Sequence, residues 1–225
     1  MDEYEIKYRA RVPRSVHNMR EPLDERTVRK ILERALAVGP GAWKLFEGYA
    51  LVSIALCTGL RPLELRQCLV SNIREDELGF IIHAKHVKGE DTWGKPRDVP
   101  VMWQGGEILR RYLNARVEKL KHLGRRSDAL FPPLRGSDEF LSSNSLTTMK
   151  TLVEEDMGIK FEPRTCRCTF GQLGLDEGHP LVNASKALGH TSAVKTQKYY
   201  ADKRQSIVVN EMRANSGKKL GELRN

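Results

Sequence analysis

The chain has 225 residues, and its 38 Lys and Arg outnumber its 29 Asp and Glu, which gives a formal net charge of +9. A mean hydropathy of −0.50 and the lack of any run of about 18 apolar residues exclude a membrane-embedded protein. The positive charge suits a polyanionic partner, most simply nucleic acid, although a solvated basic surface explains it equally well.

The cysteines and the first residues indicate the compartment. The four cysteines lack CxxC spacing and are too few for a disulfide scaffold, which favours a reducing environment. A zinc site at Cys166 and Cys168 has only this weak C-x-C signal. The first five residues show no basic segment leading into an apolar one, so we expect a cytoplasmic protein without a signal peptide.

Helical signals dominate the first third of the chain. Asp24 is suited to cap a helix whose apolar residues recur at helical spacing and which Gly39-Pro40-Gly41 ends. Residues 43–56 are almost continuously apolar and predict a central, buried helix. Gly59 then ends that helix, and Pro62 suits the first position of another turn.

The period changes between about residues 78 and 101. Residues 80–82 and 99–101 predict two short antiparallel strands, and the turn formers between them predict a hairpin that carries Lys88. Residues 106–123 predict an amphipathic helix with Ile108, Leu109, Tyr112, Leu113 and Val117 on its apolar face. Pro132-Pro133 marks a loop, and further helices are predicted at 145–156, 164–175, 180–188, 193–200 and 205–213.

Two segments place cationic side chains where an anion could bind. In TGLRPLEL, Arg61 and Glu64 are three residues apart and share a helical face, so the carboxylate can fix the guanidinium; an ordinary surface ion pair is the simpler reading. In the helix beginning at Pro163, Cys166, Phe170 and Leu173 fall on one face, and Arg164, Arg167 and Gly171 fall on the other. Two arginines at a helix start oppose its dipole unless an anion lies there.

A third segment, LGHTSAVKTQKYY, needs a bend to bring its reactive residues together. His190 and Tyr199 are nine positions apart (199 − 190), so they would face opposite sides of one continuous helix. Gly189 and a cap at Thr191 or Ser192 supply the turn.

These segments, in this order and together with VKG and RDVPV, resemble the tyrosine recombinase (phage-type integrase) family. The resemblance covers about residues 24–200 and implies the catalytic-domain fold of that family, which is mainly α with a small antiparallel β-sheet (α+β). It implies an enzyme that cleaves and rejoins double-stranded DNA at a specific site through a 3′-phosphotyrosine, integrating or excising a viral or other mobile element. No cofactor and no metal are implied, because the bond energy is conserved in the phosphotyrosine.

The resemblance also implies a role for each site residue. Arg61 and Arg167 would bind the non-bridging phosphate oxygens, where preorganised cations stabilise the transition state. Lys88 would protonate the leaving 5′-oxygen, and Tyr199 would be the nucleophile. Glu64 would orient the arginines. The implied catalytic residues are Arg61, Lys88, Arg164, Arg167, His190 and Tyr199, with His190 as a hydrogen-bond donor to the phosphate.

Alternatives remain at three positions. Tyr200 is the alternative nucleophile to Tyr199, which has the family spacing from His190, and Lys95 is a rival to Lys88 for the acid role. Arg164 stands where the family most often has His. Because a guanidinium keeps its proton, Arg164 can bind phosphate but cannot act as a base, so water or the phosphate would accept the tyrosine proton.

We divide the chain into a lead-in segment (1–22), the catalytic domain (23–200) and a basic tail (201–225). The sequence represents either a catalytic fragment or a minimal recombinase, because family members usually carry a further N-terminal helical domain. We hypothesise that the tail touches DNA or docks on a neighbouring protomer through residues 207–209; a synaptic tetramer on DNA is the family expectation. The alternatives are a topoisomerase with the same tyrosine chemistry and a non-catalytic or regulatory DNA-binding relative.

Overall fold

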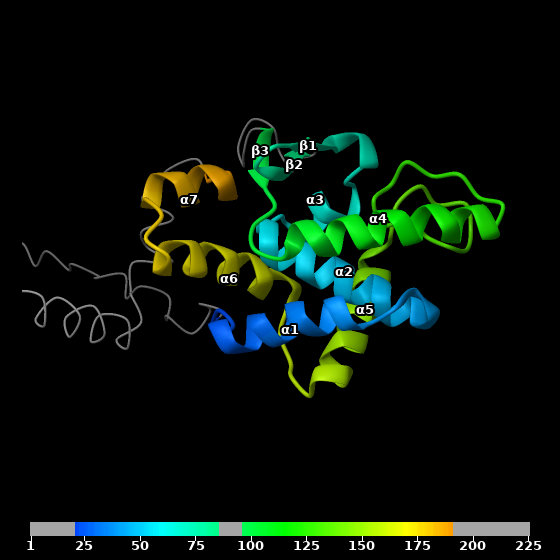
Figure 1. Cartoon of the computed structure of the whole chain (residues 1–225), viewed down its shortest axis with the longest axis horizontal. Coiled ribbons are helices and arrows are strands. Elements are labelled where there is room, and N and C mark those ends of the chain that lie inside the picture. The colour runs from blue at the N-terminus through cyan, green and yellow to red at the C-terminus, as the bar shows by residue number, and fades with distance from the viewer. Residues whose placement is uncertain (1–20, 86–95, 191–225) are drawn as a thin grey trace, which may run out of the picture.

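The computed structural model describes residues 21–85 and 96–190 (Figure 1). The expected hairpin tip with Lys88 and Lys95, the helices expected at 193–200 and 205–213, and both tyrosines, Tyr199 and Tyr200, lie outside the described residues. The elements, in chain order, are α1 (Glu25–Ala37), η2 (Pro40–Ala42), α2 (Trp43–Thr58), α3 (Pro62–Arg66), η3 (Val70–Asn72), β1 (Ile73–Asp76), β2 (Gly79–Ala84), β3 (Arg97–Pro100), α4 (Gly105–His122), α5 (Ser143–Met157), α6 (Pro163–Asp176) and α7 (Leu181–Leu188).

Helix α2 is the centre of the fold, as its apolar sequence predicts. Every residue from 46 to 58 is buried, and α1, α4, α5 and α6 all pack against it. Gly48 allows α5 to approach closely, since a Cβ there would lie 2.9 Å from the Met149 carbonyl oxygen of α5. The buried helix therefore sets the position of Gly59 and Arg61, which follow directly at its C-terminal end.

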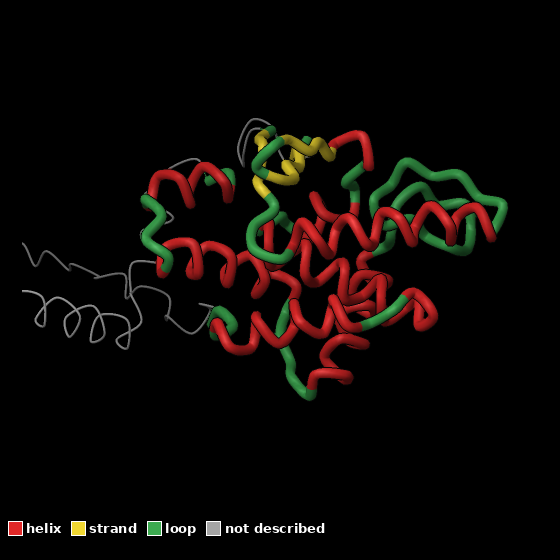
Figure 2. Tube along the Cα trace, in the orientation of Figure 1, coloured by secondary structure: helices red, strands yellow, loops and turns green. Residues whose placement is uncertain are grey.

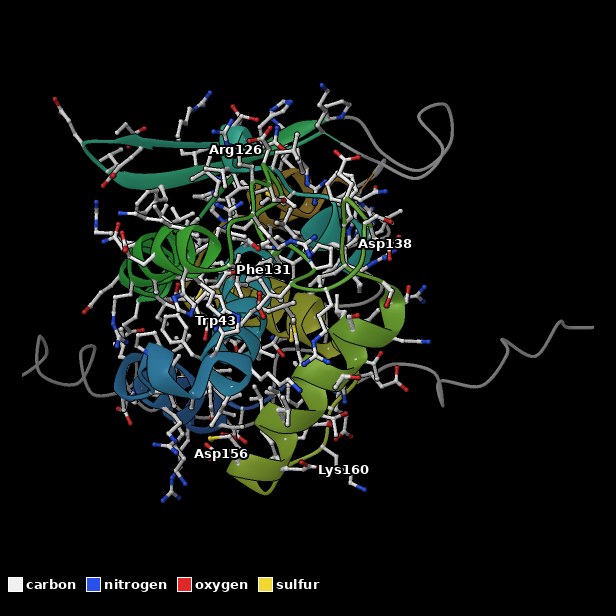
Figure 3. The ribbon with its side chains drawn as sticks, turned by 90° about the vertical axis from the view of Figure 1, so that its right-hand side faces the viewer. Trp43, Arg126, Phe131, Asp138, Asp156 and Lys160 are labelled. Carbon is white, nitrogen blue, oxygen red and sulfur yellow. The ribbon has the colours of Figure 1, made fainter. Side chains whose placement is uncertain are left out.

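The aromatic part of the core lies between α2 and α4. Tyr112 of α4 stacks on Phe131 with ring centroids 4.9 Å apart, and Trp43 lies 6.1 Å from Tyr112. Figure 3 shows Trp43 and Phe131 in the middle of the molecule, with Asp156 and Lys160 toward its edge. Burial of these large rings stabilises α4 and the loop after it.

Helix α1 follows its predicted pattern. The Asp24 carboxylate accepts a hydrogen bond from the Thr27 amide at 2.8 Å, so it caps the helix as expected. The buried face consists of Val28, Ile31, Leu32 and Ala35.

The sheet is antiparallel, as predicted, but it has three strands in the order β1-β2-β3. Its strands, yellow in Figure 2, lie together at one edge of the helical body. Ile82 of β2 lies opposite Val99 of β3 and opposite Ile73 of β1. Strand β1 has the sequence IRED, which shows no clear apolar alternation, and this is why the sequence did not predict it. The turn between β1 and β2 brings β1 into the sheet. In this turn the Asp76 side chain accepts a hydrogen bond from the Leu78 amide at 2.9 Å, and Gly79 takes a φ of +122°.

One prediction for α4 is wrong. Val117 does not belong to the buried face, since it is 57% exposed, whereas Arg116 is buried. The Arg116 guanidinium accounts for this, because it donates to the carbonyl oxygens of Ser127 and Leu130, at 2.7 and 3.1 Å, and to that of Ala129. Carbonyl acceptors in the following loop thus make a charged residue the interior one.

The remaining helices occur where the sequence predicts them. Helices α5, α6 and α7 begin and end within two residues of the predicted ranges, and residues 132–133 lie in a loop. Helices α6 and α7 lie toward one end of the molecule, and α7 contacts both α6 and β3 (Figure 1). This places the end of α7 beside the end of α2.

Within residues 21–85 and 96–190, no helix has the length and hydropathy that a bilayer crossing requires.

Candidate active site

Arg61 is positioned by the sharp change of direction between α2 and α3. Gly59 ends α2 with a left-handed φ of +62°, and the chain restarts as a helix at Pro62. Arg61 is the N-cap residue, and its amide donates to a Glu64 carboxylate oxygen at 2.8 Å. The sequence TGLRPLEL therefore folds locally so that Arg61 and Glu64 face each other, as predicted.

Glu64 is shared by two arginines. Its Oε1 accepts from Arg61 Nη1 at 2.7 Å and from Arg97 Nη1 at 2.9 Å, and its Oε2 accepts from Arg97 Nη2 at 3.0 Å. The Glu64 side chain is 2% exposed and that of Arg97 is 8% exposed, whereas that of Arg61 is 26% exposed. The simpler reading of Arg61 and Glu64 as a surface pair is therefore wrong, because the carboxylate is buried.

Arg167 reaches the same place from α6. Its Nη1 donates to the Gly59 carbonyl oxygen at 2.8 Å, and its Nη2 donates to the Leu188 carbonyl oxygen at the end of α7. Arg61 approaches the next peptide, with Nη2 3.3 Å from the Gly189 oxygen. The two arginines that the sequence predicts to act together therefore converge on the last carbonyls of α7. We call Arg61, Arg97, Arg167 and Glu64 the arginine cluster.

The end of α7 places His190 next to this cluster. Gly189 has a φ of +62° and donates to the Lys186 oxygen at 2.9 Å, and the His190 amide donates to the Ser185 oxygen at 3.0 Å. This is the glycine-terminated helix end that the sequence predicts. His190 is partly exposed and directly follows the peptide that Arg61 contacts.

Arg164 makes no hydrogen bond or ion pair with the cluster in the part of the chain that the structure describes. It is on the first turn of α6 and exposed. The helical face that Arg164 shares with Arg167 and Gly171 is not simply a solvated basic face, since Arg167 and Gly171 are both buried. The opposite face of α6 is buried, as predicted, and it carries Cys166, Phe170 and Leu173.

The electrostatics of the cluster favour an anion. Burial acts to raise the pKa of Glu64, but the hydrogen bonds and charges of Arg97 and Arg61 outweigh it and lower that pKa to about 2. The carboxylate is therefore ionised at neutral pH. Three guanidiniums and one carboxylate leave these four side chains with an excess of two positive charges, and guanidinium groups match phosphate oxygens in geometry.

Arg97 is the residue of this site to which the sequence reasoning gave no role. A signal for it was present in strand β3, because Arg97 and Val99 are two residues apart and so share a face of the sheet. Val99 is fully buried. An arginine on the same face needs hydrogen-bond acceptors inside the protein, and the Glu64 carboxylate supplies two of them.

The cysteine pair does not fit a metal site. Cys166 faces the core, where burial raises its pKa to about 12, so that the thiolate form which zinc requires is disfavoured. Within the part of the chain that the structure describes, no three His, Cys, Asp or Glu side chains gather in a way that could hold a metal ion.

Comparisons with known proteins identify relatives. The model of the phage integrase family matches residues 21–206. Tyrosine recombinase XerA of Saccharolobus solfataricus is 25% identical over 194 residues, which cover 86% of this chain and 56% of that protein.

Solved structures of recombinases share the fold. The XerH site-specific recombinase in a post-cleavage complex with a palindromic difH substrate has a TM-score of 0.67 at 21% identity, over 87% of this chain and 54% of that one. The XerA recombinase has a TM-score of 0.63 at 23% identity, over 88% of this chain and 65% of that one. A lambda integrase dimer bound to a core site has a TM-score of 0.54 at 19% identity, over 83% of this chain and 49% of that one.

The chain thus spans little more than half the length of the first of these relatives. The family match nevertheless covers all the described residues, and the described fold is that of a tyrosine recombinase catalytic domain. The chain belongs to the phage integrase family.

Proposed function

We propose that this chain cleaves and rejoins double-stranded DNA at a specific site through a 3′-phosphotyrosine intermediate. The observation that carries the proposal is the arginine cluster, in which Arg61 and Arg167 come together from segments 106 residues apart (167 − 61). Membership of the phage integrase family and the DNA complexes of XerH and lambda integrase support the same substrate.

The first step would be attack of the Tyr199 oxygen on a backbone phosphorus. A bond forms between that oxygen and phosphorus, and the bond from phosphorus to the 5′-oxygen breaks. Lys88 gives its proton to the leaving 5′-oxygen, and the tyrosine proton passes to water or to the phosphate. Arg61 and Arg167 bind the non-bridging oxygens, whose negative charge grows in the transition state, and His190 donates a further hydrogen bond.

The second step would reverse the first on a new strand. The 5′-hydroxyl of the partner strand attacks the phosphotyrosine, the phosphorus bond to Tyr199 breaks, and the phenol regains a proton. One phosphodiester is exchanged for another, so the reaction needs no external energy source. Glu64 takes no part in bond making; its contacts fix the Arg61 side chain.

Relatives also suggest the setting. The lambda integrase structure is a dimer on its core site, and the Tn1549 integrase is a transposon protein that binds a circular intermediate DNA. We infer that this chain associates with further copies on DNA and serves a mobile element, acting inside the cell on chromosomal and element DNA. The domain division at residues 23 and 200 and the DNA-contacting role of the basic tail belong to this proposal.

Covalent trapping tests the chemistry. The 225-residue chain is incubated with nicked duplexes that carry a randomised central segment, denatured, and examined for protein covalently joined to DNA, and the captured DNA is sequenced. A nick lets the short 5′-hydroxyl product diffuse away, so that the adduct accumulates. We expect an adduct whose DNA shares one sequence.

Two matched variants identify the nucleophile. Tyr199→Phe removes the hydroxyl and should abolish the adduct, whereas Tyr200→Phe should retain it. Loss of the adduct in Tyr200→Phe alone would transfer the role to Tyr200. An unsubstituted chain that binds duplex DNA but forms no adduct would contradict the proposed function and favour a non-catalytic DNA-binding protein.

A further inference from the structure

Arg97 makes contacts that join three parts of the site. It lies at the start of β3, and its Nη1 and Nη2 form two parallel hydrogen bonds to the Glu64 carboxylate of α3. Its Nε donates to the Ala187 carbonyl oxygen in the last turn of α7 at 2.6 Å. One buried guanidinium therefore ties the sheet, the start of α3 and the end of α7 together.

Gly189 shows how closely Arg97 is fitted against α7. A Cβ at this position would lie 2.9 Å from Arg97 Cδ and 3.0 Å from its Nε and Nη1. The absence of a side chain at Gly189 thus makes room for the Arg97 side chain, and Arg61 contacts the Gly189 oxygen. The peptide that leads to His190 is held between two arginines.

Arg97 also affects the net charge around the carboxylate that it shares with Arg61. Glu64 accepts from both Arg61 and Arg97, so these three groups together keep one net positive charge. Without Arg97, the charges of Arg61 and Glu64 would cancel, and the field that Arg61 presents to a phosphate would fall. Arg97 thus allows a carboxylate to fix Arg61 without neutralising the pair.

We propose that Arg97 is a positioning residue of the recombination reaction: it holds Glu64 ionised between two guanidiniums and fixes the end of α7, which sets where Arg61 and His190 meet the phosphate. This inference rests on the proposed function. Arg97 itself need not touch DNA, since its side chain is only 8% exposed.

A pH profile separates this role from a merely structural one. Arg61 and Arg97 of β3 bind Glu64 directly, and the other titratable groups near it are Cys68, His83 of β2 and Lys85 just after β2, which line a small pocket with it. When Arg97 is removed, the largest lowering influences on Glu64 are lost while burial remains, so the pKa of Glu64 rises from its depressed value. Protonation then releases Arg61 at pH values where Glu64 of the unsubstituted chain stays ionised.

The experiment uses a nicked duplex with the sequence identified by covalent trapping. It measures the single-turnover rate of adduct formation between about pH 5 and about pH 8, together with the affinity of the protein for the same duplex. Arg97→Met should slow adduct formation up to about 100-fold, the scale expected when positioned groups shift by about 1 Å, and leave DNA affinity close to the parent value. Its rate should fall further at acidic pH. Combining Arg97→Met with Glu64→Gln should remove that acidic fall.

Three further variants serve as controls. Arg97→Lys keeps the charge but not the two parallel bonds, so it should restore the pH profile of the parent at a reduced rate. Arg116→Met removes a buried arginine that binds only carbonyls in the described structure, and Arg110→Met removes an exposed partner of Glu75. Neither should produce the acidic fall. A folded Arg97→Met with the parent rate, or with a slowed rate whose pH profile is unchanged, would overturn the proposal.

Unfolding by urea gives a readout that needs no catalysis. In Arg97→Met the free energy of unfolding should be lower than in the parent at about pH 7 and should fall less, or rise, between about pH 7 and about pH 4, because the raised pKa of Glu64 lets the folded state take up the proton; Glu64→Gln should remove the difference in pH dependence. If the parent forms no adduct, the proposed function fails, while this titration still decides whether Arg97 holds Glu64 ionised. Identical unfolding profiles for parent and Arg97→Met would refute that coupling by themselves.

Discussion

Gly59 is the residue where a single added methyl group should disturb both the fold and the site. In Gly59→Ala, the backbone must keep a φ of +62°, which costs an L-residue about 1–2 kcal/mol. The new Cβ would also lie 2.5 Å from Phe170 Cδ1 and 3.1 Å from Leu188 Cδ2. Overpacking of this kind typically costs about 1–3 kcal/mol more, so the total should be about 2–5 kcal/mol.

Gly158→Ala is the matched control. Gly158 ends α5 with a φ of +65°, and a Cβ there would meet nothing within 4 Å. It should therefore cost only the backbone contribution of about 1–2 kcal/mol. Urea unfolding of both variants separates the steric contribution of Phe170 and Leu188 from that of the left-handed backbone.

A double substitution tests the named contact. Phe170→Leu should reduce the additional cost of Gly59→Ala, because it removes the ring atoms nearest the new methyl group. Adduct formation should also slow in Gly59→Ala, since the Gly59 oxygen accepts from Arg167. Equal destabilisation by Gly59→Ala and Gly158→Ala would refute the steric reasoning.

Three further substitutions should change stability in ways that urea unfolding can measure. Asp24→Ala should cost about 1 kcal/mol because it removes the cap of α1; an unchanged midpoint would contradict the capping role. For Glu47, burial raises the pKa to about 7, so the parent should lose up to about 3 kcal/mol of stability as the pH rises from about 4.5 to about 7, and Glu47→Gln should lack this loss. For Glu64, whose pKa is about 2 despite burial because of Arg97 and Arg61, the sign is opposite: stability present above about pH 4.5 should fall by up to about 3 kcal/mol toward pH 2. Glu64→Gln should be less stable at neutral pH and show a flatter acid profile; an acid profile like that of the parent would contradict the assignment.

Much of the helical framework could be predicted because its signals are local. The cap at Asp24, the apolar run through α2 and the glycine ends at Gly59 and Gly189 each act within a few residues. Strand β1 and the burial of Arg116 could not be predicted in this way, because each depends on partners elsewhere: β1 on its pairing with β2, and Arg116 on carbonyls of the following loop.

The site shows the same division. The motifs identified Arg61, Glu64, Arg167 and His190, and the structure brings the first three together beside the fourth. They did not identify the sharing of Glu64, because this depends on the register of β3 against β2, which places Arg97 opposite Ala84. The register of a strand is a tertiary property, and a one-residue shift would turn Arg97 to the other face.

The acceptors that anchor Arg97 and Arg167 in the last turn of α7 are main-chain oxygens, and no substitution can delete a main-chain oxygen. The exposed α7 residues Val182, Asn183 and Lys186 can therefore be substituted without loss of these hydrogen bonds, provided that the helix still ends at residue 188. A single-residue deletion inside α7 is different, because it would turn the remaining carbonyls by about 100°. Natural variation in this helix should consequently consist of exchanges and spare its length.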